Sequence, residues 1–265
     1  MAFRRLLRGT VPWEQLEGVV QAVIERYDEP AARVAFLEAD NWLSTPLVVN
    51  DQWFVKVITG QNSLVHTLLT AGRNIGAFSS GTEGFFEHFG TPYEMAEHEL
   101  AATQRMREIG VNAPEPIEAF EYDGMGVLVL EYIPDFEPLD DLPAETVERH
   151  SPTVFDFLHR MHEDGLAHGD FRCENVLVAH DDLYFIDATS VREAAIRDAR
   201  AYDVACALGA LEPLIGAQAA VSAAAHHYDT SELLAAEEFL DFVNIRPDHD
   251  FAAAEIRGAV EKRAN

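Results

Sequence analysis

The segment 167–187, AHGDFRCENVLVAHDDLYFID, brings three oxygen-bearing side chains close to one predicted β-hairpin. Its apolar runs VLV and LYFI each predict a strand, and the polar residues between them predict the turn. The hairpin would bring Asn175, which enters the first strand, near Asp187, which leaves the second, with Asp170 one short loop earlier. Carboxylate and amide oxygens suit Mg²⁺, so the convergence of these three side chains predicts a Mg²⁺ site at this edge of the sheet. The alternative is a capped turn, in which Asp and Asn bond only the local backbone.

Lysine occurs only twice among the 265 residues, and one of the two lies where a charge is costly. Lys56 is inside the apolar stretch 53–58, WFVKVI, which predicts a buried strand. A buried ammonium without a partner costs several kcal/mol. The sequence therefore predicts a carboxylate partner for Lys56.

Glu99 is the best candidate for this partner. A capping box at Thr91–Glu94 and a stop signal at Gly110 predict a helix between them. On that helix Glu99 shares a face with apolar residues three and four positions away, whereas the other glutamates point elsewhere. A carboxylate on an apolar face requires a cation, and Lys56 supplies it. The alternative is an ion pair that only joins the sheet to the helix.

These residues together resemble the protein-kinase-like superfamily, and within it the RIO-type atypical kinases and their aminoglycoside-phosphotransferase relatives. HGD stands where ordinary protein kinases have HRD, and FIDATS resembles the RIO "ID" metal-binding motif more than DFG. The resemblance extends from about Arg33 to about Leu214. It implies a bilobal α+β fold, with a small antiparallel-sheet N-lobe and a mostly helical C-lobe.

The resemblance also implies a role for each quoted residue. Lys56 would bind the phosphates of ATP, and Glu99 would orient that lysine. Asp170 would be the catalytic aspartate, beside the hydroxyl that attacks the phosphoryl group. Of the three side chains that converge at the hairpin, Asn175 and Asp187 would hold Mg²⁺.

Two further segments have implied roles by the same resemblance. The residues after the apolar strand 127–130 would receive adenine through their backbone, and these are Glu131, Tyr132 and Ile133. Asp203 would brace the catalytic loop from a helix. A helix N-terminal acid that is favoured only by the helix dipole is the alternative for Asp203.

Several residues depart from the kinase pattern. The connection EADNWLSTP has no GxGxxG motif, so the amides or hydroxyls of Ser44 and Thr45 would contact the phosphates instead. Arg172 stands where protein kinases commonly have lysine, and it would neutralise the transferring phosphoryl group. A salt bridge from Arg172 to a nearby acid is an equally favoured alternative. No APE-like segment follows Asp187, so the platform that seats a peptide in ordinary protein kinases is missing.

The net charge of −27 restricts the partners and the environment. Such a charge argues against strong nucleic-acid binding, and with so little lysine it is typical of a halophile's cytoplasm. Two cysteines are too few for a disulfide framework or a cysteine metal site. No apolar run is long enough for a transmembrane helix and no signal peptide is evident, so a soluble, cytoplasmic protein is expected.

The expected organisation has three parts: an N-terminal helical extension at 1–32, an N-lobe at 33–133 with an insertion at 60–90, and a C-lobe with a helical tail at 134–265. The leading functional hypothesis is an ATP- and Mg²⁺-dependent RIO-type serine/threonine kinase or ATPase. The alternatives are a small-molecule kinase of the aminoglycoside or choline kind and a nucleotide-binding pseudokinase that acts as an assembly factor. The acceptor is an unidentified protein or small molecule, and a ribosomal-assembly partner is implied by the resemblance alone.

Overall fold

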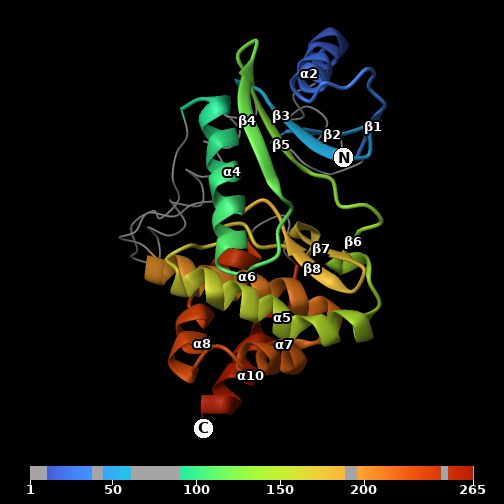
Figure 1. Ribbon diagram of the computed structural model, residues 1–265. Coiled ribbons are helices and arrows are strands. Elements are labelled where there is room, and N and C mark those ends of the chain that lie inside the picture. Colours follow the sequence, from blue (N-terminus) through green and yellow to red (C-terminus); the bar gives the residue numbers. More distant parts are fainter. Residues whose placement is uncertain (1–10, 38–43, 61–89, 189–195, 246–249, 265) are drawn as a thin grey trace. The chain divides into compact units, whose positions relative to one another are not determined.

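The computed structural model describes residues 11–37, 44–60, 90–188, 196–245 and 250–264 (Figure 1). The chain divides into two compact units. The described residues of the first, here called the N-terminal unit, are 11–37, 44–60, 90–104 and 114–134; those of the second, the C-terminal unit, are 105–113, 135–188, 196–245 and 250–264. Of the insertion expected at 60–90, only Gly60 and Gly90 are among them.

The N-terminal unit is built on one antiparallel sheet of five strands, in the order β1-β2-β3-β5-β4. The strands are β1 (Val34–Phe36), β2 (Thr45–Val49), β3 (Trp53–Ile58), β4 (Pro116–Tyr122) and β5 (Met125–Glu131). The sequence predicts strands at about 34–37, 47–49, 53–58 and 127–130; the third coincides with β3, and the others differ from β1, β2 and β5 by one or two residues at an end. A tight turn joins β4 to β5 because Asp123 and Gly124 both adopt positive φ, at 48° and 74°.

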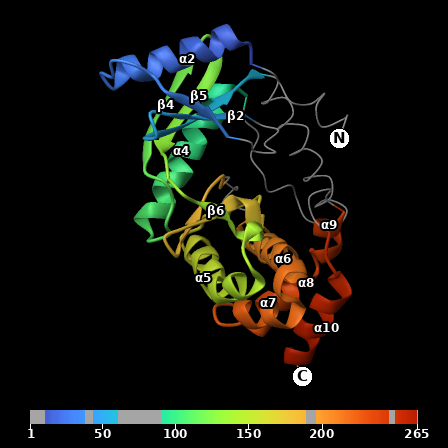
Figure 2. The same cartoon turned by 90° about the vertical axis from the view of Figure 1, so that its right-hand side faces the viewer.

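Helices cover the two faces of this sheet, as Figures 1 and 2 show. The apolar side of α2 (Trp13–Arg26) packs on one face, where its buried residues join those of β2, β3 and β5 in one core. The other face packs against α4 (Pro92–Glu108) through Ile58, Leu128 and Leu130. The helix expected in the N-terminal extension is therefore part of the core of the sheet.

The C-terminal unit is mostly helical and holds a second, three-stranded sheet, β6-β7-β8. The strands are β6 (Glu137–Pro138), β7 (Val176–Ala179) and β8 (Asp182–Phe185), and the short 3₁₀ turns are η1 (Leu139–Asp141) and η2 (Cys173–Asn175). The helices are α5 (Ala144–Glu163), α6 (Ile196–Ile215), α7 (Ala217–Ala224), α8 (Thr230–Glu237), α9 (Leu240–Asn244) and α10 (Ala253–Ala264). The expected fold class is confirmed: an antiparallel sheet in the N-terminal part and a largely helical C-terminal part.

The helix before the HGD motif begins earlier than the sequence predicts. Ser151-Pro152 predicts a helix start, yet α5 begins at Ala144 and continues through Pro152. Proline has no N–H to donate to the carbonyl four residues earlier, which is that of Glu148. The Ser151 hydroxyl donates to this carbonyl at 2.9 Å instead, so the helix continues with its backbone oxygen satisfied.

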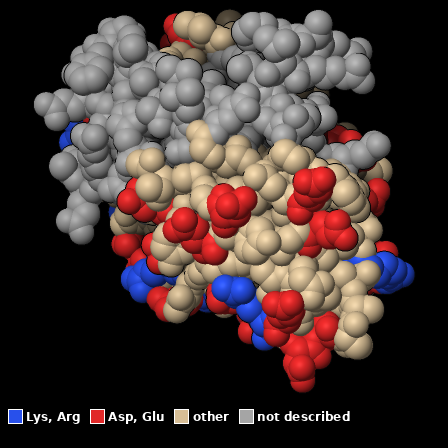
Figure 3. Space-filling view, turned by 90° about the horizontal axis from the view of Figure 1, so that it is seen from above, with Lys and Arg blue, Asp and Glu red and all other residues tan. Residues whose placement is uncertain are grey.

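The surface reflects the composition. On the face shown in Figure 3, carboxylate side chains are spread over the described surface and outnumber the basic ones.

Cys173 and Cys206 are both buried thiols outside any disulfide. Within the described ranges, every helix is too short or too polar to cross a bilayer.

Candidate functional site

The predicted ion pair between Lys56 and Glu99 is present in the N-terminal unit. The Lys56 ammonium donates to both carboxylate oxygens of Glu99, at 2.8 and 2.9 Å. The Lys56 side chain is 6% exposed and that of Glu99 is 14% exposed, so water screens the pair little. The capping box is present too, since the Glu94 amide donates to the Thr91 hydroxyl at 3.1 Å and Glu94 accepts from the Thr91 amide.

Strand register explains why the lysine points to α4. Lys56 pairs with Pro46 on β2 and with Leu128 on β5. Leu128 belongs to the apolar cluster that packs on α4, and residues opposite each other in antiparallel strands share a face. Glu99 therefore meets Lys56 across the layer between sheet and helix.

Ser44 lies on the same face, two residues before Pro46. Its side chain is buried, at 7% relative exposure, and its hydroxyl has no hydrogen-bond partner among the residues that the structure describes. Thr45 is the first residue of β2 and its side chain alternates to the opposite face. Of the two residues predicted to contact phosphates, Ser44 is thus on the face of the sheet that carries Lys56.

The segment predicted to receive adenine is partly occupied by internal hydrogen bonds. The Glu131 amide donates to the Glu115 carbonyl at 2.9 Å, and the Tyr132 amide donates to the Gln52 carbonyl at 2.8 Å. Ile133 follows these two residues and is 9% exposed. The two anchored amides fix the path of the chain up to Ile133.

In the C-terminal unit, a hydrogen bond joins Asp170 to Asn175 within the loop that is predicted to be catalytic. The Asn175 side-chain amide donates to the Asp170 backbone carbonyl at 3.0 Å. This hydrogen bond uses the nitrogen of the Asn175 side chain and leaves its oxygen as a potential ligand. Asn175 is buried, at 4% relative exposure, so its orientation is fixed by packing.

The predicted hairpin brings Asn175 and Asp187 to the same end of β7 and β8. Val176 pairs with Phe185, and the Ile186 amide donates to the Asn175 carbonyl at 3.1 Å. The turn at His180 and Asp181 has positive φ at both residues, 52° and 71°, which is the backbone of a tight two-residue hairpin.

Asp187 has a φ of 60°, a left-handed backbone conformation that aspartate adopts more readily than most residues other than glycine. Among the described residues, no group of three or more His, Cys, Asp or Glu side chains forms a metal cluster. One carboxylate and one amide oxygen still fit Mg²⁺, which takes its other ligands from water and phosphate.

Asp203 on α6 holds the backbone directly before Asp170 through hydrogen bonds. Its carboxylate accepts hydrogen bonds from the backbone amides of His168 and Gly169, at 2.6 and 2.8 Å. Gly169 has φ of 76°, a region that a side chain disfavours, which explains the glycine between His168 and Asp170. The bracing role that the resemblance implies for Asp203 agrees with this geometry.

Two further residues extend this anchor, and the sequence interpretation missed both. His162, near the end of α5, lies 3.1 Å from Asp203 through its Nε2, and its Nδ1 lies 2.8 Å from the Tyr228 hydroxyl. A histidine on the buried side of the helix before HGD is a signal that could have suggested the first. Tyr228 lies 66 residues farther along the chain, and no sequence pattern connects it with the loop.

Arg172 contacts the acids around it. Its Nη2 lies 3.6 Å from the Asp170 Oδ2, and its Nη1 forms an ion pair with Glu174. The salt bridge that was one of its two interpretations is therefore present. The ring of His168 is fully buried against Phe171 and Phe185, and this burial lowers the pKa of the imidazole.

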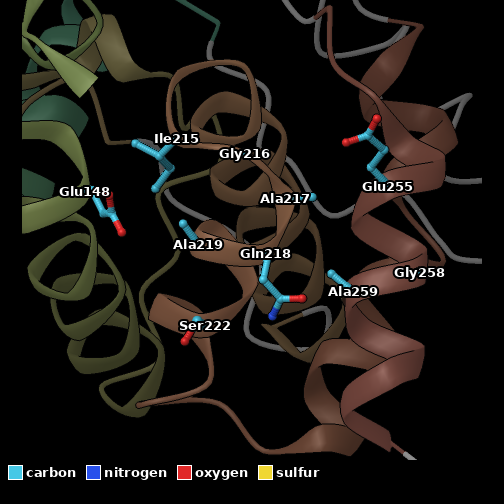
Figure 4. Close-up of a pocket in the computed structure, with 10 residues that line it drawn as sticks. All are labelled: Glu148, Ile215, Gly216, Ala217, Gln218, Ala219, Ser222, Glu255, Gly258 and Ala259. Atoms are coloured by element: carbon cyan, nitrogen blue, oxygen red, sulfur yellow. The ribbon is translucent and has the colours of Figure 1, made fainter. Parts of the chain in front are cut away.

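A pocket of about 730 Å³ lies elsewhere in the C-terminal unit. Figure 4 shows Glu148 of α5 and Glu255 of α10 on opposite sides of the α7 residues that line it. The remaining lining residues are mostly small. None of the predicted site residues lines this pocket, so it is not the site discussed above.

Comparisons with known proteins find similar sequences. The model of the RIO domain family matches residues 90–202, a stretch that contains Glu99 and the whole segment from Asp170 to Asp187. The KEOPS complex subunit Bud32 of Pyrococcus abyssi is 33% identical over 98 residues, which are 36% of this chain and 43% of that protein. The chain therefore spans less than half the length of this relative.

Solved structures give weaker likenesses. The Drosophila melanogaster PAN3 pseudokinase is 15% identical, with a TM-score of 0.45, over 89% of this chain and 64% of that one. The PK-1 kinase of the Cydia pomonella granulovirus is 14% identical, with a TM-score of 0.38, over 66% of this chain and 57% of that one.

Proposed function

Because this chain carries a protein-kinase-like domain of the RIO type, we propose that it is an ATP- and Mg²⁺-dependent phosphotransferase that acts as a serine/threonine protein kinase or ATPase. Lys56 binds the nucleotide phosphates, and Glu99 holds its ammonium in place. Ser44 adds a hydroxyl on the same face of the sheet, and the Ile133 amide receives adenine. All four residues belong to the N-terminal unit, where the Lys56 ammonium contacts Glu99.

In the C-terminal unit, Asp170 orients the acceptor hydroxyl and takes its proton. The oxygens of Asn175 and Asp187 bind Mg²⁺, which when bound neutralises charge on the phosphates. Arg172 adds a guanidinium beside Asp170, at 3.6 Å. In this proposal Arg172 exchanges its contact with the carboxylates for one with the transferring phosphoryl group.

The observation that carries the proposal is the buried two-oxygen contact between Lys56 and Glu99. Replacing a buried ion pair by apolar residues of similar size is often neutral or stabilising, so stability alone gives little reason to keep one. The chain has only two lysines, and one of them, Lys56, is buried on the face of the sheet that packs against α4. A phosphate-binding role accounts for that placement.

Replacement of Lys56 tests this role. We expect Lys56→Met to lower ATP turnover in molar KCl by about 10²–10³-fold, the usual effect of removing one group that stabilises charge in the transition state. The same variant leaves the Glu99 carboxylate without its cation and destabilises the N-terminal unit by about 3–5 kcal/mol. Turnover is followed as phosphate release and as transfer to protein, and stability by thermal unfolding.

A double variant separates the two effects. Lys56→Met with Glu99→Leu replaces the pair by apolar side chains, and we expect stability to return to within about 1 kcal/mol of wild type. Turnover should stay as low as in Lys56→Met. If the double variant regains both stability and turnover, the pair is structural and the proposed role of Lys56 is wrong.

A non-catalytic role in a protein assembly is the second candidate. The similarity to Bud32, a subunit of a complex, favours it, although the chain spans 43% of that relative. Wild-type protein that binds Mg²⁺–ATP tightly but neither hydrolyses it nor transfers phosphate would support this candidate. Transfer to a sugar or an amino alcohol, and to no protein, would indicate a small-molecule kinase.

We further propose that the protein works in concentrated salt. The net charge of −27 produces self-repulsion that is strong at low ionic strength. The Debye length falls from about 10 Å at 0.1 M salt to about 3 Å at 1 M, so added salt screens this repulsion.

The melting temperature measures this screening. We expect it to rise by about 10 °C between 0.1 and 2 M KCl, which corresponds to a few kcal/mol for a chain of this size. Sucrose at the same osmolality is the control, because it does not screen charge. An equal rise in sucrose, or no rise in KCl, would contradict the proposal.

A further inference from the structure

The hydrogen-bond chain that begins at Asp203 does not end within the kinase-like motifs. It continues through His162 to Tyr228, which lies directly before α8. All three side chains are buried, with relative exposures of 0% for Asp203, 1% for His162 and 5% for Tyr228. Water therefore cannot replace a partner that is lost from this chain.

The direction of each hydrogen bond follows from the groups involved. Burial is the largest of the causes that raise the pKa of the Tyr228 phenol, so this group keeps its proton. The Asp203 carboxylate can only accept, so the nearby His162 Nε2 carries a proton, and with that tautomer the ring offers Nδ1 as the acceptor for the Tyr228 O–H. This Nε2–H donates to Asp203 Oδ2, the oxygen that also accepts from the His168 amide. Each donor in the chain has one acceptor.

The position of Tyr228 is itself fixed by the start of α8. The next residue, Asp229, is the N-cap of that helix and forms a capping box with Glu232. The Tyr228 amide donates to the Ala224 carbonyl at 3.0 Å, and its ring packs edge-on against Phe155 at 6.3 Å. The backbone and the ring of Tyr228 are thus both held before its hydroxyl reaches His162.

We propose that Tyr228 is a positioning residue for the catalytic loop, acting through His162 and Asp203 on the backbone of His168 and Gly169. This inference rests on the proposed phosphotransferase activity for its effect on turnover. Tyr228 lies between α7 and α8, outside the residues 90–202 that match the RIO domain model. In this inference, the segment between α7 and α8 therefore helps to hold Asp170 in place.

The Tyr228→Phe variant tests the inference because it removes only the hydroxyl. In 2 M KCl we expect hydrogen exchange at the His168 and Gly169 amides to become about 5- to 10-fold faster, the effect of one lost buried hydrogen bond. We expect kcat to fall by a similar factor, with KM for ATP unchanged within about twofold, because orientation and not nucleotide binding is altered.

The matched control is Tyr27→Phe. Tyr27 donates a hydrogen bond to Glu118 at 3.3 Å in the N-terminal unit, so this variant also loses one tyrosine hydroxyl bond. We expect exchange at His168 and Gly169, and kcat, to equal those of wild type. ¹⁵N NMR of the histidines adds a direct readout, since the His162 Nδ1 resonance should shift in Tyr228→Phe alone.

The possible outcomes are distinct. Unchanged exchange at both amides in Tyr228→Phe, or faster exchange throughout the C-terminal unit, overturns the inference. If wild-type protein has no turnover, the proposed function fails, but the exchange and NMR measurements still decide whether Tyr228 positions the loop.

Discussion

In the Asp170→Asn variant we expect phosphate transfer to fall by about 10²–10⁴-fold, the range typical of a lost general base. Mg²⁺–ATP should bind with unchanged affinity, because Asp170 in our proposal serves the acceptor hydroxyl and not the metal. Asparagine has the size of aspartate, and the Asn175 amide bonds the Asp170 backbone carbonyl and not its side chain. The fold of the loop should therefore survive. Single-turnover kinetics and nucleotide titration in molar KCl measure the two quantities separately.

Two further variants make this prediction specific. Asp187→Ala should lose Mg²⁺-dependent nucleotide affinity, because it removes the one carboxylate of the predicted metal pair. Asp182→Asn makes the same change as Asp170→Asn at an exposed residue of the hairpin and should behave as wild type. Equal activity in wild type, Asp170→Asn and Asp187→Ala would refute the catalytic assignment.

The second large effect concerns stability. Asp203→Ala leaves the amides of His168 and Gly169 and the Nε2–H of His162 without their acceptor inside the protein. Each buried donor without a partner costs about 1–3 kcal/mol, so we expect a total loss of about 3–5 kcal/mol, with partial relaxation. The midpoint of thermal unfolding should fall by about 10 °C in a chain of this size.

Asp229→Ala is the matched control for this loss. It removes a carboxylate from the same unit, but Asp229 is an exposed N-cap whose replacement costs about 1 kcal/mol. Asp203→Asn keeps one acceptor oxygen and should lie between the two. If Asp203→Ala unfolds no more easily than Asp229→Ala, the loop is held by packing and not by its anchor.

The sequence predicted most of what burial and local turn chemistry determine. The strands at 45–49, 53–58 and 125–131 follow from apolar runs, because a strand covered on both faces must be apolar along its length. The helix of Glu99 follows from its capping box, and the partner of Lys56 follows from the cost of a buried charge. Each of these predictions depends on residues close in sequence or on one strong electrostatic constraint.

The missed features depend on contacts that no local pattern reveals. Strand β4 lies at the edge of the sheet, where Glu118 and Glu121 interrupt the apolar run. The start of α5 was misplaced because a serine hydroxyl satisfies the carbonyl that Pro152 cannot. The occupied amides of Glu131 and Tyr132 have acceptors that belong to other segments of the N-terminal unit.

Because Asp203 is buried, we expect dissolved salt to affect it differently from the exposed carboxylates. Mobile ions weaken forces between exposed carboxylates, but they cannot enter a site from which water is excluded. The Asp203 carboxylate is fully buried and accepts hydrogen bonds from N–H groups of His162, His168 and Gly169. We therefore expect the stability of the whole molecule to depend on the salt concentration, and the position of Asp170 to stay independent of it.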